Sequence, residues 1–98
     1  MNQISMVIPT YNERENIPLL MDDVFKSIIG CKDINLEVIV VDDNSPDGTG
    51  EIVDELSKIY PIKAIHRKRK MGLGSAVMEG FRLSEREYLV FKRLIGFE

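Results

Sequence analysis

Two hydrophobic patterns alternate along the chain. Short runs rich in Val and Ile are typical of buried parallel strands, and between them apolar residues recur every three or four positions, as on one face of a helix. The runs predict four strands, at residues 3–8, 36–41, 62–66 and 88–91. The periodic stretches predict three helices, at about residues 17–28, 48–59 and 75–83.

This order of elements predicts a three-layer α/β fold. Strands that alternate with helices pair in parallel through right-handed crossovers, and the helices cover both faces of the sheet. The 98 residues suffice for one small domain, and no internal repeat or linker divides them. We therefore expect a single α/β domain over residues 1–98.

Proline and glycine mark the expected boundaries of these elements. Pro9 is expected to close the first strand. Pro18 suits the first turn of the first helix, and Gly30 suits the position just after its last turn. Asp47 or Thr49 is expected to cap the second helix.

The second predicted strand ends in two adjacent carboxylates, Asp42 and Asp43, and a polar turn follows. Open α/β sheets bind ligands in the crevice outside the carboxyl ends of their strands, which is where this pair is expected. Neighbouring side chains on a strand point to opposite faces. We therefore assign Asp43 to a ligand and Asp42 to bracing the loop.

Tyr11 and Glu13 follow the first strand and are expected at the same edge of the sheet. Tyr11 offers a ring face to a nucleotide base, and a carboxylate accepts hydrogen bonds from the ring N–H donors of guanine or uracil. The same segment also fits an ordinary turn, because Asn12 and Asn16 are good turn and capping residues. The residue types alone leave both interpretations open.

Four consecutive cations, residues 67–70, precede Gly72 and the third predicted helix. Glycines let a backbone approach a phosphate, which helix N–H groups and Lys70 would neutralise, although a solvated basic loop is the alternative. The charge distribution favours an anionic partner, because residues 1–60 hold 4 Lys and Arg against 12 Asp and Glu, whereas residues 61–98 hold 9 against 4. The acidic first half argues against general nucleic-acid binding.

No apolar run reaches the ~20 residues of a membrane-spanning helix, and no secretory segment follows Met1. Cys31 is the only cysteine and His66 the only histidine, and we expect neither to be catalytic. A single cysteine fits a reducing compartment. We expect a soluble cytoplasmic protein whose basic half can contact a membrane surface.

Three segments resemble consecutive blocks of the family 2 glycosyltransferases, and among these the dolichol-phosphate (polyprenyl-phosphate) mannose synthases. The segments read VIPTYNERENI at residues 7–17, VVDDNSPDGTGEIVDEL at 40–56 and KMGLGSAVMEGFR at 70–82. The resemblance covers residues 4–90 and corresponds to the N-terminal half of such enzymes. It implies the nucleotide-binding half of a GT-A fold, a Rossmann-like parallel sheet with strand order 3-2-1-4.

The resemblance also implies a reaction and a site. Similar enzymes transfer mannose from GDP-mannose to a polyprenyl phosphate, and a UDP-sugar is the alternative donor. By this resemblance the nucleotide would contact Pro9, Tyr11, Glu13, Val41 and Asp43. The phosphates would lie near Lys70 and Gly72.

The chain departs from the family pattern after residue 90. Relatives continue from the fourth strand into an Asp-Ala-Asp segment that binds Mg²⁺ or Mn²⁺, whereas no Asp or Glu lies between Glu87 and Glu98 here. We therefore expect no metal ligand in the divergent tail, residues 91–98, and no catalytic residue or metal cofactor in this chain. The expected protein is a truncated glycosyltransferase that is inactive alone.

A non-catalytic α/β module, acting as an oligomer or with a partner chain, is the alternative. The implied strand order leaves the fourth strand at an edge, so we expect a homo-oligomer formed through this strand and the tail. Two other classes fit poorly. A phosphoreceiver domain needs an Asp at the end of a later strand, where His66 and Phe91 stand, and a dinucleotide oxidoreductase needs its glycines after the first strand.

Overall fold

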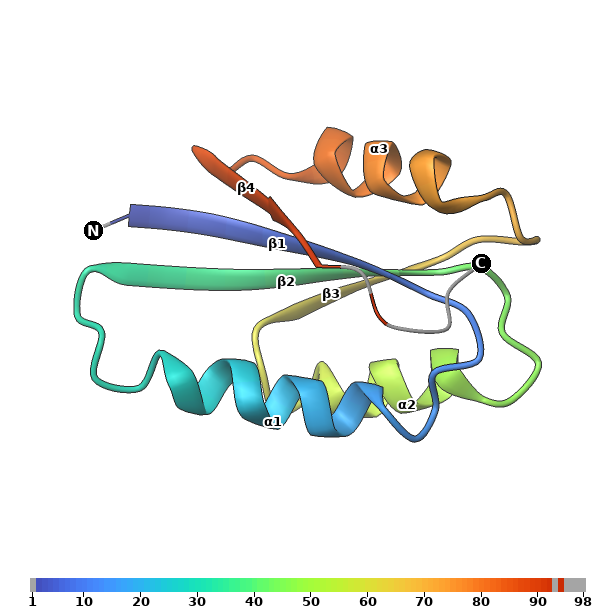
Figure 1. The fold of residues 1–98 in the computed structure, drawn as a ribbon, viewed down its shortest axis with the longest axis horizontal. Coiled ribbons are helices and arrows are strands. Elements are labelled where there is room, and N and C mark those ends of the chain that lie inside the picture. Colours follow the sequence, from blue (N-terminus) through green and yellow to red (C-terminus); the bar gives the residue numbers. More distant parts are fainter. Residues whose placement is uncertain (1, 93, 95–98) are drawn as a thin grey trace.

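The computed structural model describes residues 2–92 and residue 94. In chain order its elements are β1 (Asn2–Thr10), α1 (Ile17–Ser27), β2 (Ile34–Asp42), α2 (Thr49–Leu56), β3 (Ile62–His66), α3 (Leu73–Leu83) and β4 (Tyr88–Phe91). The strands form one parallel sheet in the order β3-β2-β1-β4. Helices α1 and α2 cover one face of this sheet and α3 covers the other (Figure 1). The predicted three-layer architecture and strand order are confirmed.

The core is built on the alternation of side chains along β2. Val38 and Val40 pack with α1 and α2, whereas Ile39 and Val41 pack beneath α3. All four side chains are fully buried, and each contributes about 1.5–3 kcal/mol of hydrophobic stabilisation. Because both faces of β2 are covered, its sequence is a continuous apolar run rather than an alternating one.

Strand β1 continues through Pro9 to Thr10, so the prediction that Pro9 closes the strand is wrong. The N–H of Lys92 donates to the carbonyl of Val7 (3.0 Å). The backbone N–H and C=O groups of the odd-numbered residues of β1 therefore point toward β4. Strand β4 pairs with β1 only along Ile4–Val7. The N–H that Pro9 lacks would therefore point past the end of this ladder, where no strand needs it.

The helix ends also differ from the predicted ones. Helix α1 ends at Ser27, and Gly30 is not left-handed, so it does not terminate the helix as predicted. Helix α3 begins at Leu73, because Gly72 takes φ 92° and ψ 158°, a conformation that only glycine adopts readily and that sets the turn there. Within the described residues, no helix has both the length and the apolar character to cross a membrane.

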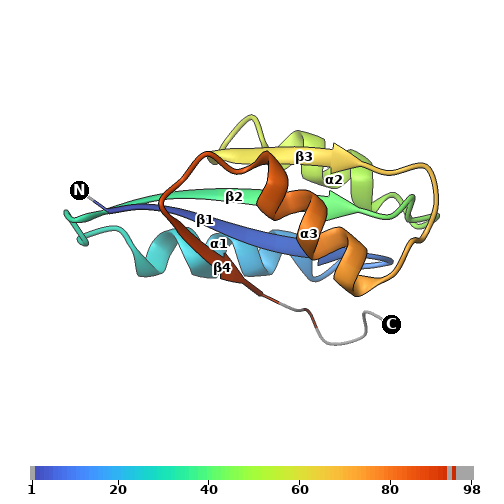
Figure 2. The ribbon, with the colours of Figure 1, turned by 90° about the horizontal axis from the view of Figure 1, so that it is seen from above.

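Helix α3 lies close against the sheet at Gly80. A Cβ at this position would collide with the side chain of Val7, so glycine sets the approach of the helix to β1. Ala76, one turn earlier on the same face, is fully buried. Figure 2 shows α3 lying over the sheet, beside β4.

A buried carboxylate, Glu37, links the strands to the α3–β4 connection. It accepts a hydrogen bond from Ser5 Oγ (2.9 Å) and pairs with Lys63 (3.1 Å) and Arg86 (3.5 Å). Burial raises the pKa of Glu37, but the hydrogen bonds from Ser5 and Lys63 and the charges of Lys63 and Arg86 outweigh burial and lower it. Glu37 on β2 is thereby linked to Ser5 on β1 by a hydrogen bond and to Lys63 on β3 by an ion pair.

Strand β4 is an edge of the sheet, because it pairs with β1 on one side only. Its side chains, Tyr88–Phe91, are 40–48% exposed. Leu94 is buried in the core cluster that lies against α1 and α2. The predicted contacts of the rest of the tail, residues 95–98, lie outside the described residues.

Candidate functional site

The loops after β1, β2 and β3 meet at one edge of the sheet, because the three strands are parallel. Two backbone hydrogen bonds hold the strand ends together: the N–H of Asp43 donates to the carbonyl of Thr10 (3.1 Å), and the N–H of Arg67 donates to the carbonyl of Asp42 (2.8 Å). The predicted nucleotide-binding and phosphate-binding residues are carried by the ends of these strands and the loops that follow them.

Asp43 is fully buried, and its carboxylate is held by Arg67 in a two-pronged ion pair. Arg67 Nε donates to one carboxylate oxygen and Nη2 to the other (2.9 Å), and the N–H of Met71 adds a third hydrogen bond (3.1 Å). Arg67 also donates to Ser75 Oγ at the start of α3 (2.8 Å). The hydrogen bond to Asp43 raises the pKa of Arg67, so the guanidinium stays charged. This pair fixes the loop after β3 upon the end of β2.

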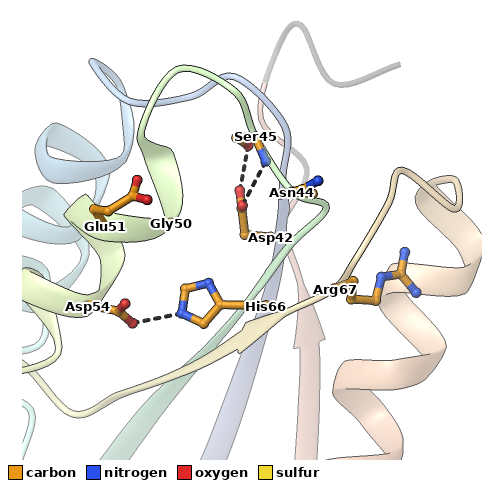
Figure 3. Close-up of a pocket in the computed structure, with 8 residues that line it drawn as sticks. All are labelled: Asp42, Asn44, Ser45, Gly50, Glu51, Asp54, His66 and Arg67. Carbon is orange, nitrogen blue, oxygen red and sulfur yellow. Dashed lines mark hydrogen bonds and ion pairs between the residues drawn. The ribbon is translucent and has the colours of Figure 1, made fainter.

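Asp42 braces the loop after β2, as predicted. Its carboxylate accepts hydrogen bonds from Thr10 Oγ1 (2.8 Å), the N–H of Ser45 (3.0 Å) and Ser45 Oγ (2.6 Å). Asp42 also lines a pocket of about 170 Å³ between this loop, α2 and the end of β3. Figure 3 shows that the side chain of Arg67 points away from this pocket, toward α3. The pocket and the Asp43–Arg67 pair therefore lie on different sides of the strand ends.

His66 lies at the pocket and contacts an acid that sequence reasoning missed. Its Nε2 is 2.8 Å from Asp54 Oδ1 on α2 (Figure 3). The ring also packs on Gly50, where an added Cβ would lie 3.1 Å from Nδ1. This contact gives His66 a packing role between the end of β3 and α2. Asp54 gave no signal in the sequence, because it is one of several acids on the exposed face of α2.

Tyr11 and Lys70 come from different loops and lie together. The ammonium of Lys70 is 4.5 Å from the centroid of the Tyr11 ring, a distance typical of a cation–π contact. Pro9 and Val41 are register neighbours on β1 and β2, and both are buried beneath this edge. The structure thus joins the predicted base-binding Tyr11 to the predicted phosphate-binding Lys70.

Glu13 is buried, and its contacts lie toward α1 and α2. Its N–H donates to Thr49 Oγ1 (2.9 Å), and its carboxylate accepts a hydrogen bond from Asn16 Nδ2 (3.0 Å). Asp47 supports the same junction, because it accepts hydrogen bonds from the N–H of Thr49 (3.0 Å) and the N–H of Arg14 (3.2 Å). Burial raises the pKa of Asp47, but these hydrogen bonds and that of the Thr49 hydroxyl lower it overall. Glu13 therefore also stabilises the turn between β1 and α1, and an ordinary turn is the alternative to base binding that the sequence left open for this segment.

Gly72 ends the loop after β3 and precedes the first turn of α3. A Cβ at this position would meet nothing within 4 Å, so the space beside it is open. Its carbonyl accepts a long hydrogen bond from Arg67 Nη2 (3.4 Å). The phosphate-binding role of Gly72 and Lys70 stays a prediction.

The carboxylates of this edge do not fit a divalent metal ion. Such an ion needs several oxygen ligands, but Asp43 is paired with Arg67 and Asp42 accepts hydroxyl and amide donors. After β4, the described residues are Lys92 and Leu94, which offer no side-chain oxygen. In the part of the chain that the structure describes, no group of three or more His, Cys, Asp and Glu side chains is placed to hold a metal.

Known proteins share long stretches of this sequence. The model of the family described as Glycosyl transferase family 2 matches residues 5–91. The dolichol-phosphate mannosyltransferase of Pyrococcus furiosus is 48% identical over 80 residues, which are 82% of this chain and 22% of that protein. The polyprenol monophosphomannose synthase of Mycolicibacterium smegmatis is 46% identical over 78 residues, 78% of this chain and 28% of that protein. The chain spans about a quarter of the length of these relatives.

Solved structures share the fold. The mannosyltransferase PcManGT from Pyrobaculum calidifontis, in complex with GDP-Man and Mn²⁺, matches with a TM-score of 0.79 at 26% identity, over 92% of this chain and 26% of that one. TarS 1–349 from S. aureus, in complex with UDP-GlcNAc, matches with a TM-score of 0.78 at 28% identity, over 95% and 26%. The sheet and its three helices are thus the GT-A arrangement that the resemblance implied. Because the family model matches residues 5–91 and the fold is shared with solved glycosyltransferases, the chain belongs to glycosyl transferase family 2.

Proposed function

We propose that the edge formed by the ends of β1, β2 and β3 binds the nucleotide of a nucleotide sugar, GDP-mannose first and a UDP-sugar as the alternative. The observation that carries this proposal is the loop at residues 67–72, which holds Asp43 through Arg67 and contacts Tyr11 through Lys70. The similar structures of PcManGT and TarS are complexes with GDP-Man and UDP-GlcNAc, which supports the same class of ligand here.

The base is proposed to lie against the Tyr11 ring, with Asp43 and Glu13 as acceptors for its ring N–H groups. A buried carboxylate that is already oriented loses little entropy when it accepts a further hydrogen bond. Pro9 and Val41 are buried, so they shape the floor of the site from below. Arg67 positions Asp43 and neutralises its charge, which lets a carboxylate remain buried at the site.

The diphosphate is proposed to lie beside Lys70 and Gly72. Helix α3 has 11 residues, and its first N–H groups and the positive end of its dipole favour an anion. Lys70 adds a positive charge, and the open space at Gly72 lets a phosphate approach the backbone. These three features act on the same group of the ligand.

The whole reaction proposed for the complete enzymes is transfer of mannose to a polyprenyl phosphate, as the relatives' names indicate, and GDP-mannose, the ligand of the similar PcManGT structure, is the proposed donor. The part proposed for this chain is donor binding. Transfer must stabilise the charge of the departing diphosphate, and residues 2–92 and 94, which the structure describes, fit no metal ion that would do so. We therefore propose that the chain does not catalyse transfer alone, and that a non-catalytic nucleotide-binding module is its function in isolation.

Isothermal titration calorimetry with GDP and UDP tests this proposal. We expect a dissociation constant from the high micromolar to the millimolar range, about −4 to −6 kcal/mol. Tyr11→Ala should weaken GDP binding at least about fivefold, since stacking on an aromatic ring contributes about 1–3 kcal/mol. Tyr88→Ala removes the same side chain from β4 and should leave binding unchanged. Equal affinities of the two variants would contradict the site.

A homo-oligomer formed through β4 is a second proposal, based on the unpaired side of this strand and its exposed side chains, Tyr88–Phe91. The alternation of the ladder points the N–H of Leu89 away from β1, since the N–H of Lys92 donates to β1. Leu89→Pro should therefore abolish self-association while the ladder to β1 stays intact. Sedimentation velocity at micromolar concentration measures this, and a monomeric unmodified chain would contradict the proposal.

A further inference from the structure

The two neighbours of Tyr11 in the chain are both held by residues at the end of β2 and in the loop after it. On one side, Thr10 Oγ1 donates a hydrogen bond to the carboxylate of Asp42 (2.8 Å). On the other side, the N–H of Asn12 donates to Ser45 Oγ (3.0 Å). The backbone is therefore anchored immediately before and immediately after the ring that is proposed to contact the base.

Both anchors meet at the carboxylate of Asp42. Ser45 Oγ donates to Asp42 Oδ1 (2.6 Å), the oxygen that also accepts the hydroxyl of Thr10, and the N–H of Ser45 donates to Oδ2 (3.0 Å) (Figure 3). Asp42 is only 3% exposed, so this carboxylate is held in one orientation. A serine hydroxyl can donate one hydrogen bond and accept another, and Ser45 uses both capacities to connect Asp42 with Asn12.

The turn that carries Tyr11 has a strained backbone. Asn12 takes φ 57°, in the left-handed region that costs free energy for a residue with a Cβ, although Asn tolerates it better than most. Within residues 2–92 and 94, Asn44 is the other non-glycine residue with a positive φ, and it follows Asp43 directly. Strained residues persist where surrounding contacts hold them, and the hydrogen bond to Ser45 is such a contact for Asn12.

From these contacts we infer that Ser45 is a positioning residue for nucleotide binding. Its hydroxyl, oriented by Asp42, fixes the turn at Asn12 and thereby directs the ring of Tyr11 toward Lys70, whose ammonium is 4.5 Å from the ring centroid. A ring that is already oriented loses less entropy when a base stacks on it. The nucleotide part of this inference rests on the proposed function, whereas the position of the ring in the free chain does not.

An ordinary turn is the alternative role of the same residues. The hydrogen bond from the N–H of Ser45 to the side chain of Asp42 is typical of an Asx turn, which would stabilise the loop after β2 without any effect on Tyr11. The two roles differ in what the loss of the Ser45 hydroxyl changes. A positioning role moves the ring of Tyr11, whereas a role in the turn alone does not.

Nuclear magnetic resonance of the ligand-free chain tests the position of the ring. The ring of Tyr11 should shift the side-chain methylene protons of Lys70 upfield, and Tyr11→Ala defines this shift by removing the ring. Ser45→Ala should lose most of the shift, whereas Ser45→Thr, which keeps a hydroxyl, should retain it. Ser27→Ala is the matched control, because it removes a hydroxyl that donates to the carbonyl of Asp23 at the end of α1, and it should leave the shift unchanged.

Titration with GDP, followed by amide chemical shifts, extends the test to the nucleotide. Ser45→Ala should weaken GDP binding about fivefold, the effect of one lost hydrogen bond, and Ser45→Thr should restore the affinity. Because Ser45 acts through the ring, Ser45→Ala should change the affinity by less than about twofold in a chain that already carries Tyr11→Ala.

Two results would overturn the inference. In the first, Tyr11→Ala weakens GDP binding, but Ser45→Ala leaves both the affinity and the shift of the Lys70 protons unchanged. In the second, Ser45→Ala causes equal losses of affinity with and without the ring of Tyr11, so that Ser45 acts by another route. An unmodified chain that does not bind GDP would instead contradict the proposed function, and the shift of the Lys70 protons would still decide whether Ser45 directs the ring.

Discussion

Replacing Arg67 by Met tests the buried ion pair at the centre of the site. The side chain of Arg67 is 6% exposed and that of Asp43 is 0% exposed, so solvent screens their interaction little. Methionine fills much of the same space but leaves the carboxylate of Asp43 buried without its cation. Removing one partner of a buried pair costs about 3–5 kcal/mol, a large part of the about 5–15 kcal/mol by which a small domain is stable.

Urea denaturation followed by circular dichroism measures the change, and a double-mutant cycle separates charge from shape. Arg67→Met and Asp43→Leu should each reduce the free energy of unfolding by about 3–5 kcal/mol. Asp43→Leu/Arg67→Met removes both charges, so it should lie within about 2 kcal/mol of the unmodified chain, far from the sum of the single losses.

Two outcomes would refute this reasoning. A loss below about 1 kcal/mol for Arg67→Met would mean that water or another group satisfies the carboxylate. A double variant as unstable as the sum of the singles would mean that the lost contacts, rather than the unpaired charge, set the cost.

Three further predictions concern stability and activity. Because the folded-state pKa of Glu37 is lowered, its contribution to stability is present above its ordinary pKa of about 4.3 and is lost as the pH falls through the folded value. Glu37→Gln should therefore make the midpoint of urea unfolding depend less on pH between about pH 5 and 3. An unchanged dependence on pH would contradict this. Gly80→Ala should destabilise the fold by about 1–3 kcal/mol in urea because its Cβ meets Val7, whereas Gly74→Ala, with open space around its Cβ, should be neutral or stabilising; equal effects would contradict the close contact. Incubation of the chain with labelled GDP-mannose, a polyprenyl phosphate and Mg²⁺ or Mn²⁺ should give no lipid-linked mannose, and metal-dependent product would contradict the proposal that the chain does not catalyse transfer alone.

The strands and helices could be predicted because their signals are local. The run at residues 36–41 needs burial on both faces wherever it lies, and the structure gives it the central position beside β1. The exact first and last residues of the strands and helices could not be predicted, because they depend on tertiary contacts that no local sequence pattern encodes. Pro9 stays in β1 because β4 has already ended beside it, and Gly30 is not left-handed because α1 ends earlier, at Ser27.

The candidate site was predictable in its position but not in its internal contacts. The carboxylates at the end of β2 and the cations after β3 were visible, and parallel pairing places them at one edge. Residues 67–70 look alike in sequence, yet Arg67 turns inward to Asp43 and Lys70 turns to Tyr11. The pair of His66 and Asp54 depends on how α2 lies against β3, which no local pattern encodes.

Titration of the isotope-labelled chain with GDP, followed by backbone amide chemical shifts, tests the central claim most directly. Binding at the proposed edge should shift the amides of residues 11–13, 43 and 70–73, and the shifts should saturate in the millimolar range or below. The amides around the pocket of Asp54 and His66, on the other side of the strand ends, should move little. Shifts concentrated at that pocket, or no saturable shifts at residues 11–13 and 70–73, would contradict nucleotide binding at this edge.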